Sequence, residues 1–457
     1  MAKMVLATKA LMVNPLKASQ PIGASLAFLG IAHAMPLEHG ARGCTSFNKL
    51  FFMRHFNEPI PLQTTAMEQT TTVLGADDNV VEALATIAKK NMPEVIGLIT
   101  TGLSEMQGAD VPRTVKMFRK QHPEYAHITI IPVAANDTLG CLETGFGDAV
   151  EAIVTALVPE GNSAGKRKSQ VNLLVPASFT PADIDEVKGW IEAFGLHPVV
   201  LPDVADSLDG HLSDVGYLTL TYGGTTRSAI QTMGLSAATL VIGSSLSKAA
   251  DALSCRTGVP DRRFPSLMGL ADCDLFTAAL AEISGRPVPD SVLRTRARLE
   301  DAMVDCQFQI GGARAGIAAD SDHLATLTRF LVSLGIDVVA AVSSIKSDVL
   351  ETLPVDEVVV GDLEDLERLV RERSAEIIVT NSHGVEIARR TGATLLRAGF
   401  PIFDSHSANS EAWVGYNGSR RTIFRIADLL AAHYQEIAPF ISRFRQPLPE
   451  LILQGVA

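Results

Sequence analysis

One pattern of hydrophobic and polar positions recurs through most of the chain. From about residue 171 onward, an apolar stretch of strand length is followed by an amphipathic helix, a glycine and another apolar stretch. In the first copy, residues 171–176 form a predicted strand, and Thr180 with Asp183 is typical of a helix start. The predicted helix ends at Gly195, and the next predicted strand covers residues 198–201. The pattern therefore predicts strands that alternate with helices.

The same pattern returns near the end of the chain, over residues 320–342 and again over residues 381–396. Two further segments, 357–361 and 376–380, are continuous β-branched runs without a polar face. Such runs are typical of strands that are buried on both sides, and these strands belong in parallel sheets covered by helices. The chain is therefore predicted to have an α/β fold.

The division into domains follows from two breaks in this pattern. Residues 159–168 are polar and rich in turn formers, and a second break lies near Gly311, after a predicted helix over 292–308. The first third shows predicted strands at 95–100 and 128–133 and a long segment, 35–72, that we predict to be irregular. We expect three open-sheet, Rossmann-like domains with largely parallel sheets, none of which carries a dinucleotide fingerprint. The predicted domains cover residues 1–165, 166–310 and 311–457.

Composition narrows the classes of function. The chain has 457 residues, 47% of them hydrophobic, and a formal net charge of −12. This charge disfavours binding to nucleic acid or to an anionic membrane, and no apolar run reaches the ~20 residues that span a bilayer. The first residues lack a cleavage site typical of a signal peptide. Five scattered cysteines argue against a disulfide framework, so we expect a cytoplasmic protein in a reducing compartment.

Cys44 is the candidate ligand of an iron–sulfur cluster. It follows Gly40 and Gly43, and glycines let the backbone fold closely around a bulky group and direct amide N–H groups at it. Iron–sulfur clusters are bound by thiolates. One cysteine cannot hold a cluster, so this interpretation requires thiolates from another chain. Taken alone, the motif also fits an inert structural thiol.

Other segments offer weaker signals. We predict that the remaining cysteines are small buried side chains. For residues 54–59 the pattern favours a local salt-bridged loop over an interface or a second shell of the cluster. Residues 100–105 and 222–226 follow predicted strands, where open sheets place ligand-binding loops, although the pattern favours ordinary turns for both. Residues 404–411 contain metal-ligand types without a regular spacing, which favours a surface loop. The cysteines in question are Cys141, Cys255, Cys273 and Cys306, and the metal-ligand types are Asp404, His406 and Glu411.

Taken in order, several segments resemble the nitrogenase molybdenum–iron protein family and its assembly-scaffold relatives. The resemblance covers most of the chain and implies the three-domain fold of nitrogenase component 1. It is carried by NPLKASQPIG at 14–23, HGARGC at 39–44, RHFNEP at 54–59, TTGLSE at 100–105, EISGRP at 282–287, RAGFPIFD at 397–404 and GYNG at 415–418.

The resemblance also implies a ligand set. In the β subunit of nitrogenase, three cysteines bind the eight-iron P-cluster, and their positions here are Ser19, Cys44 and Gly102. Only the middle thiolate is present, which departs from nitrogenase and agrees with the scaffold branch of the family. That branch implies a smaller 4Fe-4S cluster at a subunit interface. Cys44 would supply one thiolate and the partner subunit three.

For function, the resemblance implies a subunit of the scaffold on which the iron–molybdenum cofactor is matured. The cofactor precursor, held mainly by the partner, receives molybdenum and homocitrate before transfer to apo-nitrogenase. The implied partners are a NifE-type subunit in an α2β2 heterotetramer, the ATP-dependent nitrogenase iron protein, and NifB as the supplier of the precursor. No catalytic residue is expected in this chain.

Three other interpretations remain. A subunit of a related reductase, such as the dark-operative protochlorophyllide enzyme, has the same fold. A vanadium-system scaffold would have the same Cys44 pattern. A small-molecule-binding protein or glycosyltransferase-like α/β enzyme would hold no metal. Its complex would be colourless after anaerobic purification, whereas a cluster-bearing complex would be brown.

Overall fold

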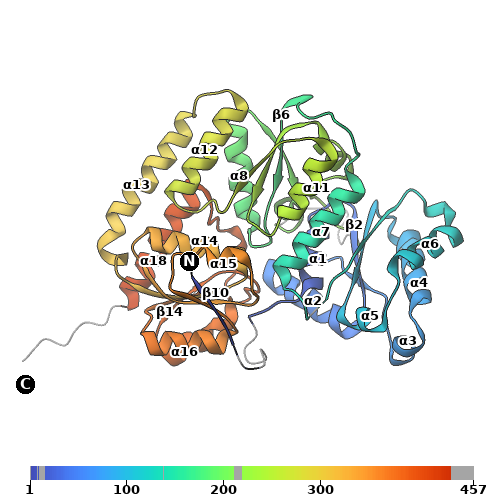
Figure 1. Cartoon of the computed structure of the whole chain (residues 1–457), viewed down its shortest axis with the longest axis horizontal. Coiled ribbons are helices and arrows are strands. Elements are labelled where there is room, and N and C mark those ends of the chain that lie inside the picture. Colours follow the sequence, from blue (N-terminus) through green and yellow to red (C-terminus); the bar gives the residue numbers. More distant parts are fainter. Residues whose placement is uncertain (1, 8, 10–15, 137, 210–218, 434–457) are drawn as a thin grey trace, which may run out of the picture.

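The computed structural model describes residues 2–7, 9, 16–136, 138–209 and 219–433. It contains three sheets, one of six strands and two of four, and every strand pair within them that the structure describes is parallel. Helices cover the sheets, as Figure 1 shows. The predicted α/β class, with parallel sheets flanked by helices, is therefore confirmed. None of the described helices is long and apolar enough to cross a bilayer.

The first sheet has the strand order β3-β2-β4-β5. Its strands are β2 (Ala34–His39), β3 (Gln63–Thr64), β4 (Val95–Thr100) and β5 (Thr129–Val133). The associated helices are α1 (Gln20–Leu29), α2 (Arg42–Phe56), α3 (Gln69–Leu74), α4 (Asp77–Asn91), α5 (Gly102–Gln107), α6 (Val111–Gln121) and α7 (Leu142–Leu157), with a 3-10 turn at Pro123–Tyr125.

The prediction that residues 35–72 are irregular is wrong. This segment contains most of β2, all of α2 and β3, and the start of α3. Strand β2 is fully buried although it includes Pro36, Glu38 and His39, which strand patterns seldom include. Only four residues of α2 are buried, and the first two, Thr45 and Asn48, are polar, so the inward side of the helix is apolar only in its second half. Both elements therefore escape detection by hydrophobic periodicity.

The second sheet has the order β7-β6-β8-β9, and its first helix begins as predicted. The Thr180 hydroxyl accepts the Asp183 N–H at 3.0 Å, and the Asp183 carboxylate accepts the Thr180 N–H at 2.9 Å, which forms a capping box. The strands are β6 (Arg167–Leu174), β7 (His197–Leu201), β8 (Ser236–Ile242) and β9 (Asp261–Phe264). The helices are α8 (Pro181–Ala193), α9 (Val204–Ser207), α10 (Arg227–Gln231), α11 (Ser247–Thr257), α12 (Leu270–Ser284) and α13 (Asp290–Ile310), with a 3-10 turn at Met233–Leu235.

The third sheet has the order β1-β12-β11-β10-β13-β14. Its strands are β1 (Lys3–Leu6), β10 (Arg314–Ala319), β11 (Asp337–Ser343), β12 (Glu357–Val360), β13 (Ile377–Thr380) and β14 (Thr394–Arg397). The helices are α14 (Ser321–Ser333), α15 (Asp348–Glu351), α16 (Leu363–Arg373), α17 (Val385–Thr391) and α18 (Gly415–His433), with 3-10 turns at Ser382–Gly384 and Ala408–Ser410.

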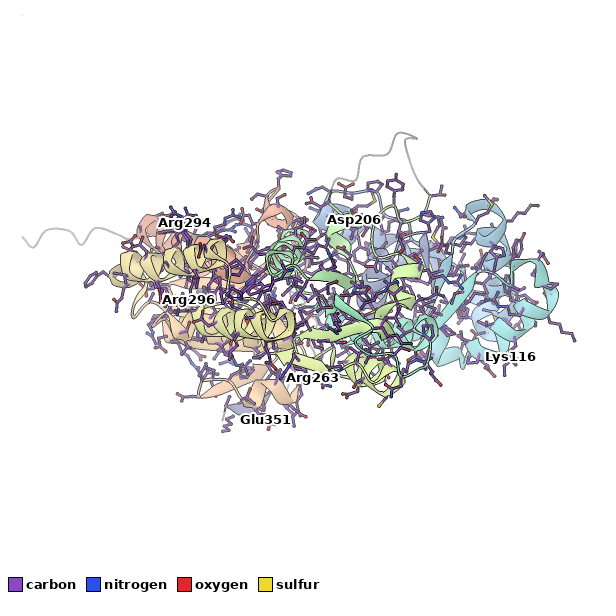
Figure 2. The ribbon with its side chains drawn as sticks, turned by 90° about the horizontal axis from the view of Figure 1, so that it is seen from above. Lys116, Asp206, Arg263, Arg294, Arg296 and Glu351 are labelled. Atoms are coloured by element: carbon purple, nitrogen blue, oxygen red, sulfur yellow. The ribbon has the colours of Figure 1, made fainter. Side chains whose placement is uncertain are left out.

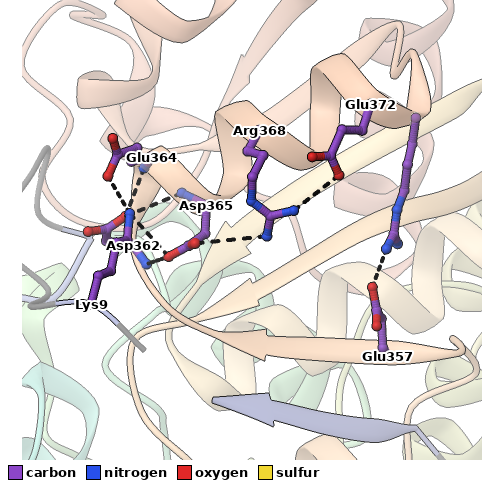
Figure 3. Close-up of polar contacts among 8 residues, drawn as sticks. Lys9, Glu357, Asp362, Glu364, Asp365, Arg368 and Glu372 are labelled. Atoms are coloured by element: carbon purple, nitrogen blue, oxygen red, sulfur yellow. Dashed lines mark hydrogen bonds and ion pairs between the residues drawn. The ribbon is translucent and has the colours of Figure 1, made fainter. Parts of the chain in front are cut away.

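Strand β1 connects the start of the chain to this third sheet. It lies parallel to β12, with Lys3 opposite Glu357. Lys9 then pairs with acidic residues at the start of α16. Its Nζ lies 2.9 Å from Asp362 and 3.5 Å from Asp365, and it also contacts Glu364, as Figure 3 shows. The predicted domains place β1 in residues 1–165 and β12 in residues 311–457, so this pairing joins two predicted domains. The domain boundaries remain a prediction.

One continuous hydrophobic core joins the three sheets. Phe28 of α1, Leu173 of β6 and Ile317 of β10 all belong to it. The molecule is elongated, with α12 and α13 at one end and α3 to α6 at the other (Figure 1). Figure 2, seen from above, shows Arg294 and Arg296 of α13 far from Lys116 of α6. The Arg296 guanidinium is held by a bidentate pair with Asp274 of α12, at 2.9 Å for each contact.

Candidate cluster site

Cys44 lies in the first turn of α2, directly after β2, and its side chain is exposed. Because β2 and β4 are parallel neighbours, the helices that follow them start at the same carboxyl edge of the sheet. Gly43 stands in open space, since a Cβ placed there would meet no atom within 4 Å. The thiol therefore has free volume beside it, as a ligand to a bulky metal cluster requires.

A buried carboxylate fixes the helix that carries Cys44. Glu38 of β2 is fully buried, and its Oε1 accepts hydrogen bonds from Ser25 Oγ of α1 at 3.1 Å and from Asn48 Nδ2 of α2 at 2.8 Å. Asn48 is one turn after Cys44, so this network ties the first turns of α2 to the sheet and to α1.

The start of α5 lies against the start of α2. A Cβ on Gly40 would lie only 2.7 Å from Thr101 Oγ1, so glycine permits the close approach of these two segments. The Thr101 hydroxyl donates to the carbonyl of His39 at 2.9 Å. Thr101 is the N-cap of α5, and Gly102 is its first residue. Cys44 and Gly102 therefore occupy neighbouring helix starts.

Ser19 lies at the same edge of the sheet. It is the N-cap residue of α1, and both of its neighbours bond to the segment that follows β5. The Ala18 carbonyl accepts the Leu142 N–H at 2.9 Å, and the Gln20 side chain accepts the Asn136 N–H at 2.8 Å. Because β2, β4 and β5 are adjacent, the structure brings Ser19, Cys44 and Gly102 to one sheet edge. Only one of the three positions carries a thiol.

The outer face of α2 is apolar. Phe47, Leu50 and Met53 follow Cys44 at intervals of three residues, and their side chains are 64%, 47% and 44% exposed. Residues at this spacing lie on one side of a helix. We call these three residues the α2 stripe. An exposed apolar face next to a candidate metal ligand is typical of a surface that a partner covers.

The other cysteines differ from one another. Cys141, Cys273 and Cys306 are buried as predicted, and burial raises the pKa of each thiol. The prediction for Cys255 is wrong, because it is exposed on α11, whose inner side is formed by Ala249, Ala250 and Leu253. Within the described part of the chain, no three His, Cys, Asp or Glu side chains are grouped so that they could hold a metal ion.

The first half of residues 54–59 is helical and is therefore not part of the loop that the pattern favoured. Arg54, His55 and Phe56 form the last turn of α2, and Asn57 ends the helix in a left-handed conformation. The Arg54 guanidinium lies over the ring of Phe403, 4.3 Å from its centroid. This turn therefore packs against the segment that follows β14.

The other candidate loops have structural roles. Thr101 and Thr226 cap α5 and α10, so residues 100–105 and 222–226 are helix starts. Asp404 is paired with Arg397 at 2.7 Å, and Glu411 is paired with Arg425. His406 is exposed. The arrangement agrees with the predicted surface loop rather than with a metal site.

An internal cavity between the second and third sheets was missed by sequence reasoning. It has a volume of about 80 Å³ and lies where the carboxyl ends of β6, β8, β10 and β13 converge. Its described lining contains carboxyl groups and two imidazoles but no lysine or arginine. Burial raises the pKa of Asp183 to about 6 and lowers that of His323 to about 4. The cavity therefore disfavours an anion, and no local motif marks it because its lining comes from many separate segments.

A model of the nitrogenase component 1 type oxidoreductases matches residues 19–431. The chain belongs to this family, as its motifs led us to expect. A relative from Klebsiella pneumoniae, named nitrogenase iron-molybdenum cofactor biosynthesis protein NifN, is 42% identical over 98% of this chain and 97% of its own length. A NifN from Bradyrhizobium diazoefficiens is 43% identical over 95% of this chain and 93% of its own length.

Solved structures agree with this family. One chain of a structure titled "Nitrogenase Cp1 at pH 6.5" matches with a TM-score of 0.88 and 29% identity, and the match covers 94% of this chain and 95% of that one. A chain of "Nitrogenase Cp1 at pH 5" matches with a TM-score of 0.70 at 15% identity, which shows the fold alone.

Proposed function

We propose that this chain is one subunit of the scaffold on which the nitrogenase iron–molybdenum cofactor is matured. In this role Cys44 supplies one thiolate to a 4Fe-4S cluster shared with a NifE-type subunit. The observation that carries the proposal is the position of Cys44, exposed beside the α2 stripe, at the sheet edge where Ser19 and Gly102 lack thiols. The names of the full-length relatives support the same role.

The site fits a shared cluster and does not fit a cluster held by this chain alone. A cubane takes four external ligands, and the Cys44 edge offers one thiolate with open space beside it. The missing ligands come from the partner, whose docking covers the α2 stripe. When bound, the cluster would supply electron transfer to the maturation reaction. This chain contributes the thiolate, the rigid helix start and the apolar interface.

The cofactor precursor is held mainly by the partner and is supplied by NifB. Two observations support this division of roles. The internal cavity is lined by acidic groups such as Glu143 and Asp322, and its described lining has no cation to balance an anionic precursor or homocitrate. In addition, the described residues contain no group of three or more His, Cys, Asp or Glu side chains that could hold a metal ion.

A second apolar surface lies near the cluster edge, on α3 and α5. Val73, Leu74 and Met106 are 82%, 80% and 89% exposed, and Gln107 of α5 donates to the Thr71 carbonyl of α3 at 3.0 Å. We call the three exposed residues the α3–α5 patch. Helix α5 is only one and a half turns long and begins at Gly102, so the patch lies close to the cluster edge. This position suits the nitrogenase iron protein, because an electron donor must approach the cluster it reduces.

Leu74→Asp is expected to lower iron-protein-dependent maturation at least ~10-fold, because a charge replaces an apolar contact at the centre of the α3–α5 patch. The chain should fold normally, since the side chain is exposed. Maturation activity is measured against iron-protein concentration. Leu275→Asp on α12 is the matched control and should behave like the wild type. Equal activity for Leu74→Asp would exclude this patch as the docking surface.

The proposed α2β2 assembly also requires a contact between two heterodimers. Helix α13 offers an exposed apolar face of Leu293, Val304 and Phe308, which are 49%, 69% and 100% exposed. It lies at the end of the molecule opposite the α3–α5 patch (Figure 1). A second copy of this chain can therefore bind there without blocking the iron protein.

Phe308→Asp is expected to convert the α2β2 complex into αβ heterodimers, because it places two charges near each other in a symmetric apolar contact. Analytical ultracentrifugation measures the change in mass. Leu74→Asp serves as the control and should leave the mass unchanged. A Phe308→Asp complex of full tetrameric mass would show that α13 is not the contact.

The coupled maturation assay tests the function itself. The purified complex, incubated with iron protein, ATP, molybdate and homocitrate, is expected to activate cofactor-free nitrogenase. The same preparation should form no ammonia from dinitrogen by itself, because the Ser19 and Gly102 positions cannot support an eight-iron cluster. Ammonia production at nitrogenase-like rates without added nitrogenase would identify a catalytic subunit instead of a scaffold.

A further inference from the structure

Helix α2 is held at its two ends by two different parts of the fold. Its first turns are bonded to the first sheet through Glu38 and Asn48. Its last turn contacts residues 400–409, which follow β14 of the third sheet. Asn48 and His55 are seven residues apart, so these two attachments are separated by about two turns, or ~10 Å.

His55 makes the contacts at the far end. Its Nδ1 accepts the backbone N–H of Ile402 at 2.9 Å, and its own carbonyl accepts a hydrogen bond from Asn409 Nδ2. The imidazole also packs edge-on against Phe56 and Phe400, with ring centroids 4.6 and 4.8 Å away. The side chain and backbone of His55 therefore join the end of α2 to the third sheet by polar and apolar contacts, beside the contact of Arg54 with Phe403.

The accepting Nδ1 determines the chemical form of the ring. A nitrogen that accepts a hydrogen bond carries no proton, so neutral His55 has its proton on Nε2. Burial lowers the pKa of His55 to about 4, which keeps the ring neutral and the bond to Ile402 intact near pH 7. The hydrogen bond that attaches His55 to Ile402 is therefore formed near pH 7.

We infer that His55 is a positioning residue for the Cys44 thiolate, because it locks the helix that carries Cys44 to the third sheet. This inference rests on the proposed role of Cys44 as a cluster ligand. A helix attached only through Glu38 and Asn48 can pivot about its first turns, whereas a second attachment about two turns later prevents that movement. The geometry of the cluster site thus depends on residues that touch neither the cluster nor the partner subunit.

The test compares two substitutions at position 55 in the complex with the partner subunit. His55→Leu removes the acceptor, whereas His55→Asn places an amide oxygen the same number of bonds from Cβ as Nδ1 and retains it. His55→Leu is expected to keep its iron but to broaden the EPR signal of the reduced cluster at least twofold and to shift its midpoint potential. His55→Asn should restore both values. His323→Leu, which removes another buried neutral imidazole that takes no part in the bonds to Ile402 and Asn409, should lower stability and leave the cluster signal unchanged.

A His55→Leu complex with the wild-type EPR spectrum and potential would overturn the inference. If that variant does not accumulate as a complex, Asn409→Ala, which removes only the bond to the His55 carbonyl, is judged by the same two values. Failure of the proposed function can be told apart from failure of the positioning role. If Cys44 were not a cluster ligand, Cys44→Ala would retain the cluster. A normal His55→Leu signal together with cluster loss in Cys44→Ala contradicts the positioning role alone.

Discussion

Cys44→Ala is expected to remove the interface cluster from the complex while the chain stays folded. A methyl group cannot bind iron, and a cubane with one iron left unligated at an interface loses metal readily. The Cys44 side chain is exposed, so its truncation should change the free energy of unfolding by no more than about 0.5 kcal/mol. Iron content and the EPR signal of the reduced complex should both fall by most of their wild-type value, and maturation activity should fall with them.

The chain provides a matched control for this experiment. Cys255 is the other exposed cysteine, on α11 of the second sheet, and Cys255→Ala should leave iron content, EPR signal and stability unchanged. If Cys44→Ala kept a full-strength signal, the ligand assignment would be wrong. Equal losses in both variants would point to general thiol damage instead of ligand loss.

The second large effect is expected for the chain without its partner. Reconstitution of the isolated chain with iron and sulfide should yield little or no stable cluster, because the candidate edge offers one thiolate where a cubane takes four. The exposed α2 stripe should also make the isolated chain prone to self-association. Iron and acid-labile sulfide analysis after gel filtration measures the first effect.

The complex with the partner subunit is the control and should retain about one cubane per pair of chains in the same procedure. Stoichiometric cluster binding by the isolated chain would refute the shared site. It would then be necessary to seek further ligands among the residues outside the described part of the structure.

Several elements of the fold could be predicted from local pattern. Strand β4 coincides with the predicted segment 95–100, and the Thr180 capping box starts α8 as predicted. Strand β2 could not be predicted, because a buried Glu38 is tolerable only through hydrogen bonds from Ser25 and Asn48, which come from other elements. Helix α2 was missed for a different reason, since its apolar stripe points outward.

The candidate site shows the same limit. The sequence pattern alone left Cys44 as one of several possible thiols, and the resemblance to nitrogenase gave it a role. The proximity of Cys44 to Ser19 and Gly102 depends on the order of β2, β4 and β5 in the sheet, and no single segment of the sequence encodes that order. Cys255 was placed wrongly because its apolar character was taken as a sign of burial, although two residues after Leu253 it lies on the opposite side of α11.

The attachment of β1 to the third sheet has a consequence for the order of folding during synthesis. Lys3 is synthesised 354 positions before its partner Glu357. At a synthesis rate of ~5–20 residues per second, about 20 to 70 s pass between the synthesis of β1 and that of β12, the strand with which it pairs. The first and second sheets can form during that interval, whereas this edge of the third sheet is closed only after β12 has been made, by a strand made more than 350 residues earlier.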